Sequence, residues 1–480
     1  MRRCINLMLL SFAIFFAGDE PLPAQQVEQF VSTADLRLAM KRGAVLSLRK
    51  GAVPRDVAIE IDESQRFQRM DGFGASITDS AAYLIQQKLT PLVRSQVLQT
   101  LFSPTRGMGL SFLRQPIGSE DLSRHHFTFD DMHKGQTDTA LAHFATPVEQ
   151  AEIFATVREA LRLNPQLTVM ATPWSPPAWM KTNDTMDGGE LLQRYEPAYA
   201  SYLVRVIQTF YTEGIPVRYI TVQNEPLNDL RMMASAGMSA AQQARFISLH
   251  LGPNLRRARL PTQILVFDHS WTHLEFPLAL LADPKVRPFI AGSALHCYDG
   301  EAGAQTKIHD AAPDKGIWMT ECSGGTWDKE APLLKTARVL IESTRNWAKA
   351  VSLWGVALDQ NRGPWDGGCD TCRPLVTIDV SKLPATVTYT GDLFGLGHAS
   401  RFVRPGAVRI GSTSTGHSNL QSVSFQNVDG TIALLVLNNS SSTSPFTIIW
   451  HGRHASTTLR PLSVATFFWK SRPYRNGRHP

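Results

Sequence analysis

The sequence predicts an α/β fold, a (β/α)8 TIM barrel over residues 67–403 with a β-sandwich domain appended to it. The middle of the chain alternates between short apolar segments and amphipathic stretches of helical period, whereas both ends contain strand-like segments separated by turns. The chain has 480 residues, enough for one large domain and a companion. We expect residues 25–66 and 404–480 to form that companion together, as one discontinuous β-sandwich.

The two ends of the chain carry the strand signals. Near the N-terminus, Val45–Leu48 and Val57–Ile61 alternate or run apolar between turns. Near the C-terminus, apolar runs cover Leu420–Phe425, Ile432–Leu437 and Phe446–Trp450, with Asp-Gly and Asn-Asn turn signals between them. Because no helical period interrupts these segments, both ends are predicted to be β-structure.

The middle of the chain carries the barrel signal. Amphipathic stretches such as Ala151–Leu163 and Tyr199–Tyr211 separate successive apolar segments. Strands that alternate with helices favour a parallel barrel; a doubly wound sheet is the alternative, but no G-x-G-x-x-G follows the first strand. The eight strand candidates lie near residues 70–75, 109–116, 167–173, 218–224, 263–268, 291–296, 317–321 and 350–356.

Composition excludes several classes of protein. Apolar residues make up 43% and charged residues 19%, which excludes a disordered chain and a coiled coil. No apolar run approaches the roughly 20 residues of an integral membrane span. The net charge of +6 (48 basic against 42 acidic residues) is spread out, so we expect no nucleic-acid partner. No nucleotide or metal motif occurs, so we expect no cofactor and no metal; oligomeric state is left open.

Residues 1–24 are predicted to be a signal peptide. They combine a positively charged start, the apolar run Leu7–Ala17 and a small-residue cleavage site that ends at Ala24. An anchoring helix is the weaker alternative, because the run is short and an acidic pair follows it. The mature chain is expected to begin near Gln25 and to be secreted or periplasmic.

Four cysteines remain after the predicted cleavage. Cys369 and Cys372 form a C-x-x-C pair in a Gly-rich loop, and no second pair stands at zinc-ribbon spacing. In an oxidising compartment we expect these two to form a disulfide that staples the loop, with Cys297 and Cys322 free. Redox catalysis is the alternative, but the pair lacks the strand-to-helix context of a disulfide oxidoreductase.

Two carboxylates stand where the chemistry of a barrel is expected. The fourth strand candidate leads to Asn224-Glu225-Pro226, and the seventh ends at Glu321. Reactive groups of such barrels lie at the C-terminal ends of the strands, and strands four and seven face each other across the mouth. Each Glu alone would more often be a rim residue. Together they match the acid and the nucleophile or base that cleave a glycosidic bond.

Aromatic residues near other strand ends favour a sugar ligand. Trp174 ends the third strand, Tyr298 follows the sixth, and Trp354 lies in the eighth. Flat apolar rings suit the C–H faces of pyranose rings. Core packing is the alternative for each ring taken singly; three at strand ends favour binding.

A set of short motifs runs in order over nearly the whole predicted mature chain: Asp71–Ala75, Phe112–Pro116, Asp121–Ser123, Pro173–Asn183, Asn224–Pro226, Thr320–Cys322 and Trp354. In this order they resemble glycoside hydrolase family 30, which contains the glucosylceramidases. The resemblance implies a retaining enzyme whose barrel is joined to a β-sandwich made from both chain ends.

The resemblance also implies roles for the residues at the strand ends. Glu225 would be the acid/base and Glu321 the nucleophile, with Arg114 and Tyr298 holding Glu321 ionised. A cation and a hydroxyl donor should lower the pKa of Glu321, and a drier setting should keep Glu225 protonated.

The same resemblance implies a sugar subsite beside the cleaved bond. Asn224 would hydrogen-bond the 2-hydroxyl, Asp121 and Trp174 would grip the outer hydroxyls, and Trp354 would form the floor. The implied substrate-binding set is Asp121, Trp174, Asn224, His296, Tyr298 and Trp354.

These observations together predict a secreted β-glycosidase that works by double displacement. A glucosylceramidase-like activity on a β-glucoside or glycolipid is the leading hypothesis. Alternatives within the same family are an endo-β-1,6-glucanase acting on a β-glucan and a β-xylosidase. A catalytically silent sugar-binding protein is a remote alternative, against which the presence of both Glu225 and Glu321 argues.

Overall fold

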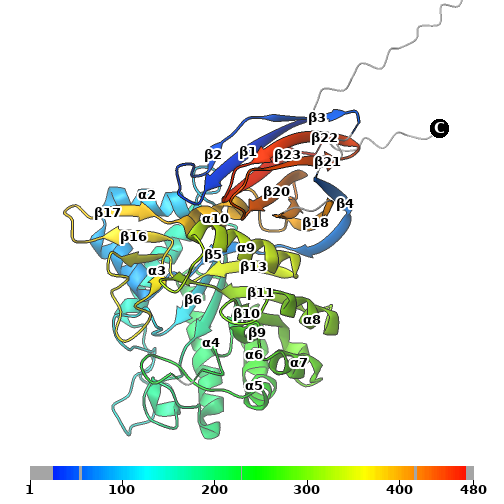
Figure 1. Ribbon diagram of the computed structural model, residues 1–480. Helices are drawn as coiled ribbons and strands as arrows, with labels where there is room; N and C mark the ends of the chain where they lie inside the picture. The colour runs from blue at the N-terminus through cyan, green and yellow to red at the C-terminus, as the bar shows by residue number, and fades with distance from the viewer. Residues whose placement is uncertain (1–24, 53–56, 229, 416–418, 472–480) are drawn as a thin grey trace, which may run out of the picture.

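The computed structural model describes residues 25–52, 57–228, 230–415 and 419–471, and it confirms the predicted fold class (Figure 1). Eight parallel strands close into a barrel in chain order. The predicted signal peptide, residues 1–24, lies outside the described residues. The barrel strands are β5 (Gly72–Ala75), β6 (Phe112–Ile117), β7 (Thr168–Pro173), β8 (Val217–Thr221), β9 (Gln263–Ser270), β10 (Ile290–His296), β11 (Gly316–Glu321) and β13 (Ala348–Leu353).

Helices with one apolar face cover the outside of the barrel. In α4 (Glu196–Thr212) the buried residues Leu203, Val206 and Phe210 recur at helical spacing. Both helices predicted from period are present, and each begins earlier than expected, α3 at Val148 and α4 at Glu196. Besides α4, the α-helices around the barrel are α1 (Asp79–Tyr83), α2 (Pro91–Phe102), α3 (Val148–Leu163), α5 (Ala240–Phe246), α6 (Gly252–Arg257), α7 (Glu275–Ala282), α8 (Gly303–Ala311) and α9 (Pro332–Arg345).

Side chains fill the inside of the barrel at its N-terminal end. Asp71 accepts hydrogen bonds from the Tyr219 hydroxyl and the Trp318 indole, both at 2.8 Å. Gly74 lets β5 approach β6, because a Cβ there would overlap the backbone of Phe112. The barrel is therefore closed at this end, which leaves the C-terminal mouth for a site. The buried interior layer is Phe112, Met170, Tyr219, Leu265, Ala294, Trp318 and Ala350.

Strands from both chain ends form one sheet beside the barrel; Figure 1 shows the blue N-terminal strands next to the orange and red C-terminal ones. The sheet returns on itself, because β3 pairs with both β22 and β1 and thereby encloses a second apolar core. Its strands are β1 (Gln25–Thr33), β2 (Lys41–Arg42), β3 (Leu46–Lys50), β4 (Ala58–Arg69), β18 (Val408–Thr415), β19 (Leu420–Gln426), β20 (Thr431–Asn438), β21 (Ser444–Trp450), β22 (Arg453–Leu459) and β23 (Ser463–Lys470).

A buried histidine joins the two parts. His398 on α10 (Gly391–Ser400) lies 2.9 Å from the hydroxyl of Ser32 in β1 and 2.9 Å from that of Thr466 in β23. Burial lowers the pKa of His398 to about 3, so the ring is neutral and pairs with hydroxyls. This contact fixes the β-domain against the barrel.

Short strands shape the loops at the barrel mouth. β12 (Gly324–Gly325), just after Glu321, pairs with β15 (Cys372–Arg373) of the C-x-x-C loop. A second small sheet contains β14 (Ala357–Asp359), β16 (Val376–Asp379) and β17 (Thr386–Tyr389). Within the described residues, none of the helices has the length and apolar character needed to cross a membrane.

Candidate active site

Two carboxyl groups meet at the mouth of the barrel. Glu321 is the last residue of β11, and Glu225 lies in the turn that follows β8. Because all eight strands are parallel, both side chains are delivered to the same end. A carboxylate oxygen of Glu225 and one of Glu321 lie within 4.8 Å of each other. The structure thus brings together the two residues that the sequence analysis paired.

Glu321 is held by a buried cation and a hydroxyl. Arg114 Nη1, from β6, lies 2.5 Å from Glu321 Oε2, and the Tyr298 hydroxyl donates to Oε1 at 2.7 Å. Arg114 has no exposed surface, and its guanidinium lies 4.6 Å from the ring of Trp174. Charge-assisted hydrogen bonds of this kind fix both the place and the orientation of a carboxylate. The predicted contacts of Arg114 and Tyr298 with Glu321 are present.

Asp268, at the end of β9, is a central residue of the site that the sequence analysis missed. It has no exposed surface, and its Oδ2 accepts from Arg114 Nη2 at 2.8 Å. The hydroxyls of Thr221 and Thr320 donate to its carboxylate at 2.8 and 2.7 Å. Burial raises the pKa of Asp268, but the charge of Arg114, the hydrogen bond and charge of His296 and the hydrogen bond of Thr320 together outweigh burial and hold this pKa well below its usual range. An acidic residue after the apolar run Ile264–Phe267 was the signal available in the sequence.

His296 lies beneath the site, and this differs from the substrate-binding role predicted for it. Its ring has no exposed surface; Nδ1 lies 3.0 Å from Glu225 Oε1 and Nε2 lies 3.0 Å from Asp268 Oδ1. Burial alone would lower the pKa of His296, but the carboxylates of Glu321, Asp268 and Glu225 raise it to about 9. A cationic His296 therefore supports Glu225, and its two ring nitrogens face carboxylates.

The pKa values of the two glutamates differ from the sequence-based expectation. Burial raises the pKa of Glu321 despite the nearby charges of His296 and Arg114. Burial also acts on Glu225, but the hydrogen bond and charge of His296 outweigh it and lower the pKa of Glu225. The expected split, with the pKa of Glu321 lowered and that of Glu225 raised, is therefore wrong. The physical reason is the cation of His296, whose position against Glu225 was not foreseen.

Three residues at and beside Glu225 have a left-handed backbone conformation. Glu225 has φ +44°, and Phe267 and Asp268, in the adjacent strand, have φ +77° and +61°. Non-glycine residues in this region each cost of order 1–3 kcal/mol and persist where surrounding contacts impose them. Here the amide of Glu225 donates to the Asp268 carbonyl at 3.0 Å, and Asn228 Nδ2 donates to the Glu225 carboxylate at 2.6 Å. The strained turn aims Glu225 at Glu321.

A cavity of about 460 Å³ opens in front of the two glutamates. This volume lies in the range of about 300–1,000 Å³ typical of small-molecule sites. Trp174 and Trp354 stack in its wall with ring centroids 4.9 Å apart. Of the predicted residues, Asp121, Trp174, Asn224, Glu225, Tyr298, Glu321 and Trp354 line it, whereas Arg114 and His296 lie below; Asn228, Met233, His269 and Trp327 line it without having been predicted.

Two buried polar atoms in the wall of the cavity are placed to hydrogen-bond a ligand. Within the described residues, Oδ1 of Asp121 and Nε1 of Trp354 are buried and make no hydrogen bond of standard geometry, although Trp354 lies close enough to the Asp121 carboxyl to favour its ionised form. Burial and the charges of Glu321 and Glu225 raise the pKa of Asp121 to about 8. The neighbouring Glu120 accepts the amides of Leu122 and Asp79, at 2.5 and 3.2 Å, so Glu120 binds the local backbone. An acceptor and a donor left open in a cavity suit a hydroxylated ligand.

The four cysteines within the described residues form two disulfides, so the expectation that Cys297 and Cys322 are free is wrong. They are bonded to each other, with Cα atoms 5.2 Å apart. His296 of β10 stands in register with Glu321 of β11, which makes the residues that follow these two neighbours in space. The predicted disulfide between Cys369 and Cys372 is present, and both residues line the cavity.

In the part of the chain that the structure describes, two groups of side chains are close enough to share a cation. One is Glu225, His296 and Glu321; the other is Asp121 with Cys369 and Cys372. In the first, Arg114 already neutralises Glu321 and both nitrogens of His296 face carboxylates. In the second, the sulfur atoms are joined to each other and are not thiolates, the form that binds metals. Neither donor set suits a metal, and the absence of a metal cofactor stays a prediction.

Comparisons with known proteins agree with this geometry. The family model for the glycosyl hydrolase family 30 TIM-barrel domain matches residues 70–403, and that for the family 30 β-sandwich domain matches residues 406–467. An endo-1,6-β-D-glucanase of Neurospora crassa is 32% identical over 397 residues, covering 80% of this chain and 81% of that protein. The lysosomal acid glucosylceramidase of Mus musculus is 26% identical over 463 residues, covering 90% and 87%. A solved endo-β-1,6-glucanase structure has a TM-score of 0.86 and 32% identity, covering 93% of this chain and 100% of that one.

Proposed function

The chain belongs to glycosyl hydrolase family 30, and from this premise we propose that it is a retaining β-glycosidase that cleaves β-1,6-linked glucan. The observation that carries the mechanism is the approach of the two carboxylates to within 4.8 Å. Retaining glycosidases have their carboxyl groups about 5–5.5 Å apart, whereas inverting enzymes need about 6.5–9.5 Å to admit a water. The short separation supports direct attack by one carboxylate on the sugar.

In the first step, a carboxylate oxygen of Glu321 attacks the anomeric carbon while Glu225 gives its proton to the departing glycosidic oxygen. The C–O bond to the leaving group breaks and a covalent glucosyl-enzyme forms. In the second step Glu225 takes a proton from water, the water oxygen attacks the anomeric carbon, and Glu321 is released. Glu321 suits the role of the nucleophile because Arg114 and Tyr298 fix both of its carboxylate oxygens.

Glu225 must be protonated when the leaving group departs. His296 lowers the pKa of Glu225, but Glu225 lines the cavity, where a bound sugar would cover it. Removing water from a carboxyl raises its pKa, so substrate binding itself favours the acid form. The two glutamates are close enough to titrate as a pair, so the negative charge of Glu321 favours the acid form of Glu225 before the first step. Once Glu321 is esterified that charge is gone, and Glu225, which has given up its proton, is left ionised to act as the base.

The remaining cavity residues would bind the sugar. Asn224, whose Oδ1 accepts from Arg114 at 2.7 Å, leaves its amide free for the 2-hydroxyl. Asp121 and Trp354 offer the open acceptor and donor to outer hydroxyls, and Trp174 supplies an aromatic wall. The resemblance of the sequence motifs to glycoside hydrolase family 30 implies each of these roles, and the residues that line the cavity are consistent with them.

A β-1,6-glucan is preferred over a glucosylceramide as the substrate. The Neurospora crassa relative and the solved structure at 32% identity are both endo-β-1,6-glucanases, which supports the alternative hypothesis over the leading one. Asn228, His269 and Asp299 contribute polar groups to the cavity rim, as a sugar leaving group would require. A predicted signal peptide and two disulfides support an exported enzyme.

Glucosylceramide is the second candidate, because the mouse lysosomal glucosylceramidase is similar over 90% of this chain. Product analysis on gentio-oligosaccharides, glucosylceramide in detergent and an aryl β-xyloside tests the choice. We expect kcat/KM to be highest on gentio-oligosaccharides. Faster turnover of glucosylceramide would establish the second candidate instead, and activity on the xyloside alone would contradict both.

A further inference from the structure

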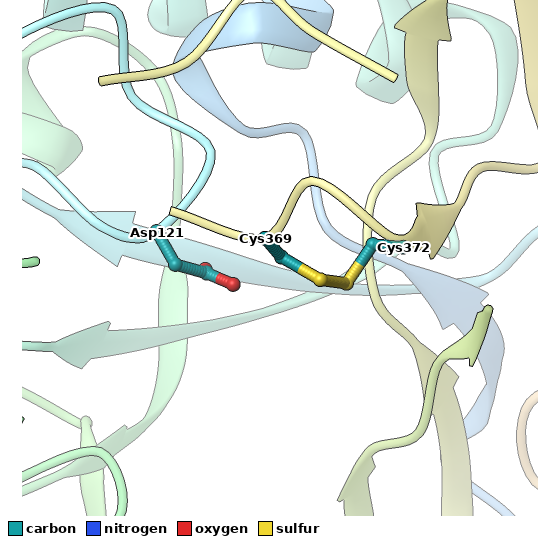
Figure 2. Close-up of side chains that lie close together, drawn as sticks. All are labelled: Asp121, Cys369 and Cys372. Carbon is teal, nitrogen blue, oxygen red and sulfur yellow. A yellow bond between two sulfur atoms is a disulfide. The ribbon is translucent and has the colours of Figure 1, made fainter. Parts of the chain in front are cut away.

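The Cys369–Cys372 disulfide lies in the cavity wall directly beside Asp121. A carboxylate oxygen of Asp121 and both sulfur atoms lie within 4.8 Å of one another. Figure 2 shows the Asp121 side chain extending toward the disulfide, which the chain presents from a different loop. The proposed chemistry uses neither sulfur, so the placement of this bond against a sugar-binding carboxylate calls for a separate explanation.

The Cys369 end of the disulfide is fixed on the backbone of Asp121. The amide of Cys369 donates to the Asp121 carbonyl at 3.2 Å. Gly368 packs against the same carbonyl, and a Cβ there would overlap it. Gly367, with φ +76°, packs in the same way against the carbonyl of Met232. Only glycine fits these two positions, because both lie so close to a backbone carbonyl of another loop. The C-x-x-C loop is therefore packed tightly between two other loops at the mouth of the barrel.

The Cys372 end is fixed on the segment that follows Glu321. Cys372 lies in β15 and pairs with Gly325 of β12, four residues beyond Glu321. The next residue, Arg373, anchors β15 through ion pairs with Asp328 and Asp392. The C-x-x-C loop therefore lies between the loop that carries Asp121 and the strand pair that follows Glu321, and the disulfide joins the two ends of the loop that make these contacts.

The disulfide also belongs to the aromatic wall of the cavity. Cys372 is buried in a cluster with Leu122, Trp174 and Trp354, and Cys369 packs against that cluster. Oδ1 of Asp121 makes no hydrogen bond of standard geometry among the described residues, so packing against its neighbours, Trp354 included, contributes to holding this oxygen in place. The sulfur atoms form part of that packing.

We propose that the Cys369–Cys372 disulfide is a positioning element of the sugar subsite, which holds the Asp121 carboxylate where it accepts hydrogen bonds from a glucosyl unit. This inference rests on the proposed function. Removing the cross-link frees both the Asp121 backbone contact and the wall beside its carboxylate. The sugar is then bound less tightly in both the ground state and the transition state.

The test is steady-state kinetics of the Cys369→Ser/Cys372→Ser variant on an aryl β-glucoside. We expect kcat/KM to fall about ten- to a hundredfold, mainly through KM, because a misplaced binding group weakens ground state and transition state alike. The melting temperature should change little, since so short a loop removes little unfolded-chain entropy. An unchanged KM in a folded variant would overturn the inference.

A double-mutant cycle with Asp121→Ala separates positioning from a general effect. If the disulfide acts through Asp121, adding Cys369→Ser/Cys372→Ser to Asp121→Ala should cause less than a twofold further loss of kcat/KM, since coupled residues are not additive. If the fold losses of kcat/KM caused by the two changes separately multiply in the combined variant, the disulfide does not act through Asp121.

Reductant distinguishes this disulfide from Cys297–Cys322. Dithiothreitol should raise the KM of the wild-type enzyme more than that of the Cys369→Ser/Cys372→Ser variant. Equal responses would assign the effect to Cys297–Cys322 and contradict the inference. A wild-type enzyme inactive on every β-glucoside would overturn the proposed function, and this inference with it. An active wild type with an unaltered serine variant would overturn the inference alone.

Discussion

The Nδ1 atom of His296 lies 3.0 Å from a carboxylate oxygen of Glu225, and the ring has no exposed surface. On its other side, Nε2 faces Asp268 at 3.0 Å, which favours the cationic form of the ring. Asp268 also accepts from Arg114, the residue that binds Glu321. One buried network of alternating charges thus supports both glutamates from below.

The pH dependence of activity should report this network. His296→Gln removes the cation that lowers the pKa of Glu225, so that pKa rises. The acid form of Glu225 then persists to higher pH, and the alkaline limb of the kcat/KM profile should move upward by at least about half a pH unit. The exposed His133→Gln is the matched control. A limb that stays in place, or moves to lower pH, would exclude His296 from setting the titration of Glu225.

Removal of the nucleophile should abolish turnover on every substrate. Glu321→Gln leaves no carboxylate to form the covalent intermediate, so kcat should fall by about 10⁴-fold or more on gentio-oligosaccharides and aryl β-glucosides alike. The measurement is kcat on both substrates, with circular dichroism to verify folding. Retention of more than a hundredth of the activity on either substrate would assign the nucleophile elsewhere.

Removal of the acid should depend on the leaving group. Glu225→Gln cannot donate a proton, which matters most for a sugar leaving group and least for an activated aryl group. We expect losses in the rate of the first step of about 10²–10⁴-fold on gentiobiose and less than tenfold on a dinitrophenyl β-glucoside. Pre-steady-state kinetics isolates that step. Equal losses on both substrates would argue against Glu225 as the general acid.

The open carboxylate of Asp121 should set the sugar preference. Asp121→Ala removes an acceptor for outer hydroxyls, so kcat/KM should fall at least about a hundredfold for an aryl β-glucoside and less for the matching β-xyloside, which lacks the hydroxymethyl group. Asp310→Ala, on the outer helix α8, is the control. A loss of thermal stability with an unaltered glucoside-to-xyloside ratio would mean that Asp121 serves the fold and does not select the sugar.

Much of the site could be predicted because a barrel converts sequence order into spatial order. Apolar period located the strands, and parallel strands deliver their C-terminal residues to one mouth, which placed Glu225, Glu321 and Trp174 together. The C-x-x-C spacing, in a chain expected to be exported, similarly predicted the Cys369–Cys372 bond.

What could not be predicted depends on register and backbone conformation. The Cys297–Cys322 bond follows from the pairing of His296 with Glu321, and no periodicity in the sequence encodes that register. The positive φ of Asp268 likewise directs its carboxylate in a way that strand alternation does not predict. The pKa directions of the glutamates depend on both features.

Retention of configuration at the anomeric carbon can be measured by time-resolved proton NMR during hydrolysis of a β-1,6-gluco-oligosaccharide. Two displacements at the anomeric carbon, the first by Glu321 and the second by water, restore the β configuration. We expect the β-anomer of the new reducing end to appear first and mutarotation to form the α-anomer afterwards. Initial appearance of the α-anomer would require a single displacement by water and would contradict the assignment of Glu321 as nucleophile.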